Sequence, residues 1–300
     1  MKLSSVLFAV VVLVLVISLV AIWFYPSVQD FMASNTMWNG IKNFASEFNA
    51  DNIDSLDNLP TLPEKTTLVV IPYLKPDNEE LTKMKRFINN GGTLLLMDDY
   101  GFGNTVLAYL GVDIRFTNKP LLDPIFFNKH PQLPRITDFA PKVTASGIDA
   151  IMLNHATTLT NVPESAAIAW SSDYSFLDID ENGSLGQDET KGPFTVAAEL
   201  RLGKGTLALA SDPSIMINSM VGRDDNRQFI SYLISRQGEQ KKILIDRSHL
   251  IPGKAPLDIS RIKLSDTTKI LSSPYALVGI LAMIFVVVSR HTLKKGGTIG

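Results

Sequence analysis

The hydrophobic and polar positions of this 300-residue chain define three regions, an apolar stretch near each end and a patterned middle. The first stretch runs from Leu3 to Pro26 without a charged residue, and the second runs from Ile270 to Ser289. Each has about 20 residues, which a helix needs to cross a hydrocarbon core of about 30 Å. The pattern therefore predicts transmembrane helices in residues 1–26 and 270–289.

The first stretch could be either a cleaved signal peptide or a retained transmembrane anchor. Its apolar core is longer than the 7–15 residues that are usual in signal peptides. Trp23, Phe24 and Tyr25 close it with the aromatic residues that are enriched at membrane interfaces. These features favour a retained anchor, although the sequence leaves cleavage of this segment open.

Basic residues indicate the orientation of the two predicted spans. A basic tail, residues 290–300, follows the second span, whereas no Lys or Arg lies between Lys2 and Lys42. By the positive-inside rule, both termini lie in the cytoplasm and residues 27–269 lie outside. We therefore expect a two-pass protein of the cell membrane, with the lipid bilayer as one partner.

The regions that flank the central pattern differ from it in composition. Residues 27–66 are rich in Asn, Asp, Ser and Pro, which is typical of a stalk or linker. A short amphipathic helix is expected within Val28–Phe48, where aromatic residues recur at near-helical spacing. Residues 248–269 form the second expected linker, so the folded domain is expected at 67–247.

Alternation of strand-like and helix-like segments begins after the first linker. Continuous apolar runs at 67–72 and 93–97 predict strands buried on both faces. Helices are expected at 79–90, capped by Asp77, and at 104–110. Strand–helix alternation with short connections predicts an α/β fold with a mostly parallel sheet and flanking helices.

The second half of the middle region predicts further elements of both kinds. The expected strands are 150–153, 166–170, 194–200, 206–210 and 242–245, and the expected helix is 226–236. Residues 202–205 form the turn of a hairpin between two of these strands.

Several short motifs of this chain occur together in a known family. They are Asn90–Gly101, Asn104, Leu110–Val112, Gly192–Phe194, Ser211–Ser214, Asn218 and Asp225–Asn226. With them, residues 65–236 and the flanking spans resemble uncharacterised membrane-anchored domains of unknown function related to gliding-motility ABC-transporter auxiliary proteins. The resemblance implies a Rossmann-like fold of the class I glutamine amidotransferase type. Those enzymes use a cysteine nucleophile, and because this chain has no cysteine, glutaminase chemistry is excluded.

An acidic segment, residues 178–189, matches the twelve-residue calcium loop D-x-[DN]-x-[DN]-G-x5-E. The expected ligands are Asp178, Asp180, Asn182, the carbonyl of Ser184, and Glu189. Alternate side chains of such a loop converge on one centre because Gly183 permits a sharp turn. The sequence thus predicts a structural Ca²⁺ site, with a solvated acidic turn as the alternative.

Polar residues also follow the predicted parallel strands. Ligands of open α/β sheets bind beyond the carboxyl ends of the strands. The candidate ligand-binding residues are Asp98, Asp99, Tyr100, Asn104, Ser211, Asp212 and Asn218. The alternative is that these residues cap helices and order loops.

The net charge and the absence of known catalytic and nucleotide-binding motifs exclude several classes of function. The net charge of −2 and the absence of a basic stripe in the middle region exclude a typical nucleic-acid-binding protein. No G-x-S-x-G elbow, P-loop or dinucleotide fingerprint is present. We therefore expect a non-enzymatic, membrane-anchored binding module, an accessory subunit of a transporter-like or envelope complex with a protein partner. A metal-dependent hydrolase using Asp98, Asp99 and Asp212 and a structural envelope spacer are the alternatives.

Overall fold

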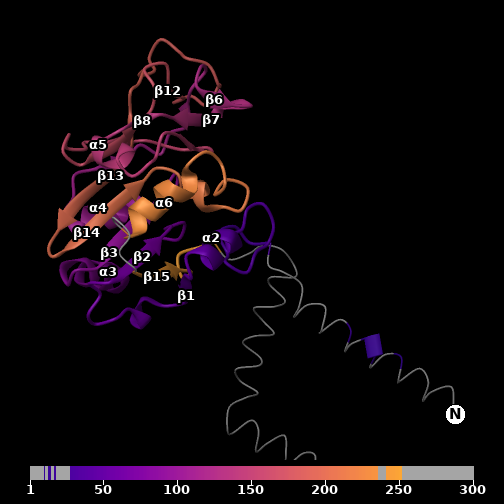
Figure 1. Cartoon of the computed structure of the whole chain (residues 1–300), viewed down its shortest axis with the longest axis vertical. Helices are drawn as coiled ribbons and strands as arrows, with labels where there is room; N and C mark the ends of the chain where they lie inside the picture. Colours follow the sequence, from indigo (N-terminus) through magenta and orange to yellow (C-terminus); the bar gives the residue numbers. More distant parts are fainter. Residues whose placement is uncertain (1–9, 11–12, 15–16, 18–27, 236–240, 252–300) are drawn as a thin grey trace, which may run out of the picture. The chain divides into compact units, whose positions relative to one another are not determined.

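The computed structural model describes residues 10, 13–14, 17, 28–235 and 241–251 (Figure 1). The chain forms two compact units, one of residues 26–252 and one of residues 1–25 and 253–300. None of the helices within the described residues has the length and apolar composition to span a bilayer. The second predicted span, the basic tail, most of the first predicted span and most of the linker 248–269 lie outside the described residues.

A ten-stranded mixed sheet forms the centre of the 26–252 unit. Its parallel part consists of β1 (Asp51–Ile53), β15 (Lys242–Asp246), β2 (Thr66–Val70), β3 (Thr93–Met97) and β14 (Gly205–Ala210), in this spatial order. The antiparallel part adds β13 (Thr195–Leu202), β10 (Leu159–Thr160), β4 (Arg115–Phe116), β11 (Ala167–Trp170) and β8 (Asp138–Phe139). The structure thus confirms the α/β class and the central, mostly parallel sheet.

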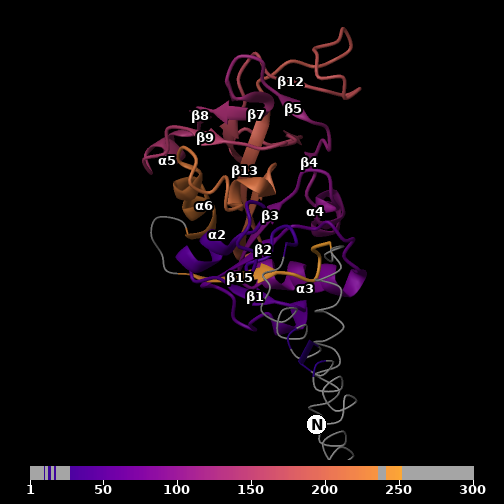
Figure 2. The same ribbon diagram turned by 90° about the vertical axis from the view of Figure 1, so that its right-hand side faces the viewer.

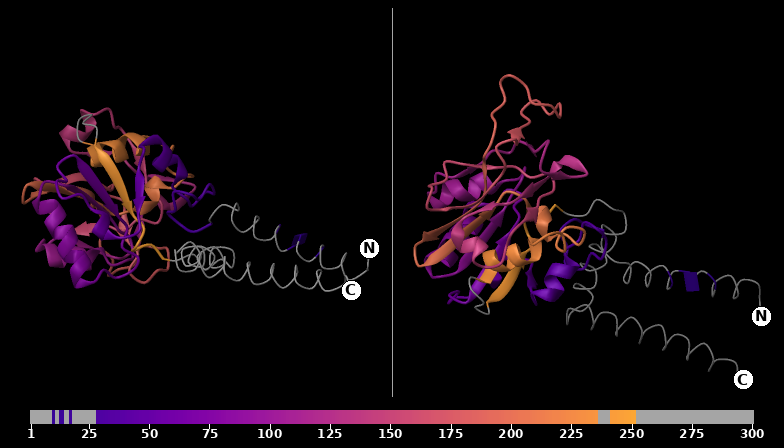
Figure 3. Two further views of the ribbon diagram at one scale, coloured as in Figure 1. Left: turned by 90° about the horizontal axis from the view of Figure 1, so that it is seen from below. Right: turned by 45° about the horizontal axis from the view of Figure 1, so that its top comes forward.

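Helices cover both faces of this sheet because successive strand residues point to opposite sides (Figure 3). On one face, Leu68, Leu94 and Leu96 pack with residues of α3 (Asn78–Asn89) and α4 (Gly103–Leu110). On the other face, Val69 and Leu95 share a buried cluster with residues of α2 (Lys42–Glu47) and α6 (Asn226–Ser235). Burial on both faces explains why the parallel strands are continuous apolar runs.

Local signals place α3 and α4 where the sequence predicted them. Asp77 and Glu80 form a capping box at the start of α3, with Asp77 accepting from the backbone N–H of Glu79 and Glu80. Gly111 ends α4 in the left-handed conformation with φ 78°. The predicted strands at 93–97 and 206–210 and the predicted helix at 226–236 are likewise confirmed, within a residue at each end.

The sequence did not predict several short elements. They are β5 (Leu121–Leu122), β12 (Phe176–Leu177), β6 (Phe127–Asn128), β7 (His130–Ile136), α5 (Pro141–Thr144), η1 (Leu56–Asn58) and η2 (Pro213–Met216). Of these, β5, β7 and β12 lie at the end of the unit away from α3 (Figure 2). The strand expected at 150–153 is present as β9 (Ile151–Met152). Two-residue strands carry too little periodicity to be recognised from sequence.

The segment 28–66 differs from the expected stalk because it packs into the folded unit. Ile41 and Phe44 are completely buried, and β1 extends the sheet by pairing with β15. The helix expected within Val28–Phe48 is confined to α2. Asn218 fixes the preceding turn, since its side chain donates to the carbonyls of Asn35 and Met37 at 3.1 and 2.6 Å. Polar residues of this segment serve turns rather than a flexible linker.

Candidate functional site

The acidic loop, residues 178–189, is closed at its base by backbone bonds. Leu177 donates to the carbonyl of Thr190 at 3.2 Å, and Phe176 forms a bridge with Lys191. At the start of the loop, the backbone N–H of Asp178 donates to the carbonyl of Pro120 at 3.0 Å. Because both ends are tied to the folded unit, the loop projects from a fixed base beyond β12 (Figure 2).

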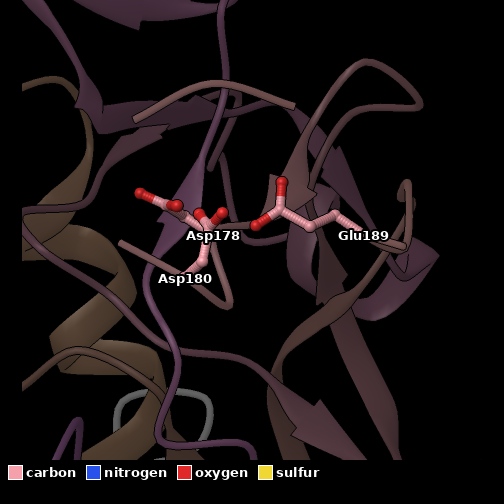
Figure 4. Close-up of side chains that lie close together, drawn as sticks. All are labelled: Asp178, Asp180 and Glu189. Atoms are coloured by element: carbon pink, nitrogen blue, oxygen red, sulfur yellow. The ribbon is translucent and has the colours of Figure 1, made fainter. Parts of the chain in front are cut away.

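Three of the five predicted calcium ligands lie together in this loop. Asp178, Asp180 and Glu189 each offer one oxygen, and these oxygens lie within 4.8 Å of one another (Figure 4). Ca²⁺ binds oxygen at about 2.4 Å, so two oxygens that share one ion are separated by at most about 4.8 Å. The spacing of these oxygens is therefore small enough for one calcium ion to contact all three.

The carboxylate of Asp178 gives an independent sign of a ligand. Its Oδ2 accepts a hydrogen bond from the backbone N–H of Gly183 at 3.0 Å. Gly183 adopts φ 77° at the sharp turn of the loop. Its Oδ1 is buried and has no hydrogen-bond partner within the described part of the chain, and the residue is only 2% exposed. An uncompensated buried carboxylate oxygen is unfavourable, and a bound cation would compensate it.

A fourth predicted ligand, Asn182, bonds within the loop. The Asn182 side chain donates its N–H to Asp180 at 2.7 Å, and its Oδ1 accepts from the backbone N–H of Ser184 at 2.8 Å. Glu189 accepts backbone N–H groups of Ile179 and Gly186 at 2.6 and 2.8 Å. The amide oxygen of Asn182 thus serves the turn in this structure, while Asp178, Asp180 and Glu189 form the cluster.

A second group of carboxylates lies at the carboxyl edge of the parallel sheet, where the sequence predicted it. Asp98 and Asp99 follow β3, and Asp212 follows β14; all three are buried. Asp98 accepts backbone N–H groups of Gly101 and Gly103, both at 2.7 Å. These contacts order the turn into α4, which is the capping role that the sequence left as an alternative.

Asp212 and Asp99 have similar local bonds. Asp212 accepts from the backbone N–H of Asn154 at 2.6 Å and of Ser214 at 2.7 Å. Asp99 accepts from the backbone N–H of Tyr100 at 2.7 Å and from the hydroxyl of Tyr73 at 3.2 Å. Each carboxylate therefore holds loop backbone at the ends of the strands.

Burial changes the ionisation of this group. It raises the pKa of Asp98 to about 6 and that of Asp212 to about 8, and it also raises the pKa of Asp99. The charge of Asp99 adds to the shift at Asp212. Burial and the nearby Asp99 raise the pKa of the Tyr73 and Tyr100 phenols above their usual range. Asp212 is therefore mostly neutral near pH 7, whereas Asp98, with a pKa of about 6, is mostly ionised there.

The remaining predicted ligand-binding residues have structural contacts. Asn104 bonds the backbone of Phe116 in both directions, donating at 2.9 Å and accepting at 2.8 Å. The Oδ1 of Asn218 accepts from the backbone N–H of Asn43 at 2.9 Å. Ser211 is buried beside Asp212, and its hydroxyl has no partner within the described residues. Neither asparagine directs its amide toward the carboxylates.

One ionisable group was not predicted from the sequence. His249 is buried between Asp246, which bonds its Nδ1, and Glu80, whose Oε2 lies 3.2 Å from its Nε2. Burial alone would lower the pKa of His249, but Asp246 and Glu80 outweigh this effect and raise it. Glu80 lies on α3, far from the other two in sequence, so local spacing gives no signal for the triplet.

Comparison with protein families gives one match, to the model described as "Domain of unknown function (DUF4350)", over residues 33–234. No curated protein matches the sequence. Similar solved structures include the mmIFT52 N-terminal domain, with 16% identity, a TM-score of 0.45, and coverage of 56% of this chain and 75% of that one.

Two glycosidases are also similar in part. A β-galactosidase from Bacillus circulans sp. alkalophilus has 13% identity and a TM-score of 0.33, with coverage of 56% of this chain and 22% of that one. The exo-β-1,4-mannosidase Op5Man5 from Opitutaceae bacterium strain TAV5 has 10% identity and a TM-score of 0.28, with coverage of 58% and 24%. Such limited similarity carries no functional argument.

Proposed function

We propose that this chain, which belongs to the DUF4350 family, is a non-enzymatic, membrane-anchored binding module whose loop 178–189 binds Ca²⁺. The observation that carries the proposal is the closeness of one oxygen each from Asp178, Asp180 and Glu189, together with a buried Asp178 oxygen that has no hydrogen-bond partner within the described residues. A calcium ion would neutralise this concentration of negative charge and fix the loop. We propose a structural role for the ion, which would order the loop.

Calcium would also fix apolar side chains that a protein partner can contact. Ile179 and Leu185 lie on the loop with exposed fractions of 45% and 42%. The predicted orientation places the loop outside the membrane, where sites with dissociation constants of about 10⁻⁴–10⁻³ M bind calcium. We therefore assign the domain to an accessory subunit of a transporter-like or envelope complex.

A non-enzymatic role is supported by the contacts of the carboxyl-edge aspartates. Both oxygens of Asp98 and of Asp212 accept backbone N–H groups, and burial favours the neutral form of Asp212 near pH 7. A metal-dependent hydrolase would need these groups ionised and directed at a metal. If the chain were such an enzyme, Asp99→Asn would abolish hydrolysis without unfolding the protein.

The calcium proposal is tested by thermal unfolding of the full chain with excess EDTA and with 1 mM free Ca²⁺. For a dissociation constant of about 10⁻⁴ M, linkage gives about 1.4 kcal/mol of stabilisation at this concentration. A rise in Tm of about 3–6 °C is expected for a unit of this size. The result that would overturn the proposal is an unchanged Tm at several millimolar calcium.

Two variants that each remove one negative charge distinguish binding of Ca²⁺ at a defined site from general attraction of cations to the acidic loop. Glu189→Gln removes a carboxylate of the cluster, whereas Asp188→Asn removes the neighbouring exposed carboxylate, which lies outside it. The calcium-dependent rise should disappear in the first variant and persist in the second. Equal loss in both would indicate diffuse attraction of cations rather than a site.

The proposed membrane topology has its own test, because the chain contains no cysteine. A single cysteine introduced as Asp113→Cys, at an exposed position of the domain, should react with an impermeant maleimide in intact cells. Thr298→Cys in the basic tail should react only after the cells are permeabilised. The opposite labelling pattern would reverse the proposed orientation.

A further inference from the structure

A cavity of about 740 Å³ lies at the amino edge of the parallel sheet, opposite the acidic carboxyl edge. Its floor includes Thr93 at the start of β3 and Thr206 near the start of β14, which are paired in register. This volume lies within the range of about 300–1,000 Å³ that is typical of small-molecule sites. The cavity belongs to neither the acidic loop nor the carboxyl-edge cluster.

The charge of the cavity wall points to an anionic ligand. Four cationic side chains line it, from Lys142, Arg201, Lys204 and Lys241. Two anionic side chains accompany them, from Glu64 and Glu199. Among the described residues, the wall therefore has an excess of two positive charges, although the whole chain has a net charge of −2. This concentration of positive charge is local and does not follow from composition.

Existing ion pairs account for only part of this charge. Lys142 lies 3.2 Å from Glu199, so these two side chains neutralise each other. Arg201 donates to the Thr206 hydroxyl at 3.3 Å and to the carbonyl of Lys204 at 2.8 Å, which orients its guanidinium without neutralising it. Within the described residues, neither Arg201 nor Lys204 forms an ion pair with a carboxylate.

The two threonine hydroxyls complete an oxyanion-binding arrangement. Thr93 and Thr206 are each 4% exposed, and each hydroxyl accepts a bond from a cation, Lys241 at 3.0 Å and Arg201 at 3.3 Å respectively. Each hydroxyl proton is therefore left to be donated to a ligand oxygen. Hydroxyl donors beside guanidinium and ammonium groups suit phosphate, which accepts several charge-assisted hydrogen bonds.

The hairpin turn between β13 and β14 holds the cations in place. Gly203 adopts φ 58°, and a side chain there would approach within 2.6 Å of the Asn89 Oδ1 and 2.9 Å of its Cα. The backbone N–H of Lys204 also donates to the carbonyl of Asn89 at 3.4 Å. Since the turn packs on the end of α3, Arg201 and Lys204 rise from a fixed backbone.

We infer that this amino-edge cavity is a binding site for a small soluble ligand bearing phosphate groups. Arg201, Lys204 and Lys241 contact the phosphate oxygens, and the Thr93 and Thr206 hydroxyls donate to them from the floor. The site is independent of calcium, because none of the residues of the acidic loop lines the cavity.

The test is isothermal titration of the full chain with pyrophosphate at about physiological ionic strength, where diffuse attraction is screened beyond about 8 Å. Citrate, titrated in parallel, supplies equal or greater negative charge without phosphate. We expect saturable binding of pyrophosphate that is at least about tenfold tighter than binding of citrate. Equal binding of the two anions, or no binding of pyrophosphate, would overturn the assignment.

Variants locate the binding in the cavity. Arg201→Gln should weaken pyrophosphate binding by about tenfold or more, since it removes a charge-assisted contact. Lys75→Gln makes the same change of charge at an exposed position beyond the carboxyl end of β2 and should bind as the wild type does. Thr206→Val, which keeps the side-chain shape and removes the hydroxyl, should also weaken binding. Equal affinity in Arg201→Gln and wild type would refute the site.

Discussion

The carboxyl group of Asp212 should make the stability of the folded unit decrease as the pH rises from 5 to 7. Burial raises its pKa from 3.8 to about 8, so at these pH values the folded state holds a proton that the unfolded state has released. This contribution is fully present below about pH 4 and is lost as the pH rises through about 8. A difference of one bound proton changes the free energy of unfolding by about 1.4 kcal/mol per pH unit, so the loss between pH 5 and 7 is about 3 kcal/mol.

Asp212→Asn should remove this dependence, because an amide does not ionise. The variant keeps one acceptor for the backbone N–H groups of Asn154 and Ser214, so a loss of about 1–3 kcal/mol is expected at low pH. The measurement is urea unfolding of residues 26–252 at pH 5, 6 and 7, followed by tryptophan fluorescence. The free energy of unfolding should fall less steeply with pH in the variant, by about 1.4 kcal/mol per unit.

Parallel pH profiles of wild type and Asp212→Asn would refute the reasoning. They would mean that the two backbone N–H bonds outweigh burial and keep Asp212 ionised in the folded state. The metal-dependent hydrolase would then regain support, because Asp98, Asp99 and Asp212 would offer three charged carboxylates. Asp113→Asn, the same change at an exposed position, should reproduce the wild-type profile and serves as the control.

Three substitutions test the packing that defines the unit. Phe44→Ala should lower the free energy of unfolding by about 3–5 kcal/mol because Phe44 is completely buried. An effect below about 1 kcal/mol would mean that the segment 28–66 does not pack into the core and is a stalk. Asp77→Ala should lower it by about 1 kcal/mol through loss of the α3 cap, measurable by urea unfolding. Asn226→Ala should lower it by about 2–3 kcal/mol because its buried amide bonds the backbone of Met152 and Met220, and Tm would fall accordingly.

Elements with local signals could be predicted, and elements that depend on distant partners could not. The α3 helix carries its cap and its buried face within one short segment, so its bounds follow from sequence. In contrast, β1 exists because Asp51–Ile53 pairs with Leu244–Asp246 at the other end of the domain. The polar residues around β1 favour turns locally, and only the tertiary fold shows that the segment belongs to the sheet.

The candidate sites follow the same division. The acidic loop is a contiguous motif, and three of its predicted ligands lie together. Asp98, Asp99 and Asp212 could be grouped because parallel strands end at one edge. The amino-edge cavity could not be predicted, because Lys142, Arg201 and Lys241 come from separate elements and none belongs to a motif.

The two edges of the parallel sheet differ in their accessibility to a ligand, and this difference favours binding at the amino edge. In open α/β folds the carboxyl edge holds the ligand. Here the ring of Phe31 lies 5.6 Å from that of Tyr73, and the Tyr73 hydroxyl bonds Asp99, so the chain's own N-terminal segment packs over that edge. Because that segment also contributes Phe31 and Met32 to the core, a ligand that enters between the segment and the edge would have to displace part of the fold. At the amino edge, Arg201 and Lys204 line a cavity and form no ion pair with a carboxylate within the described residues, so we expect a ligand to bind there without displacing part of the fold.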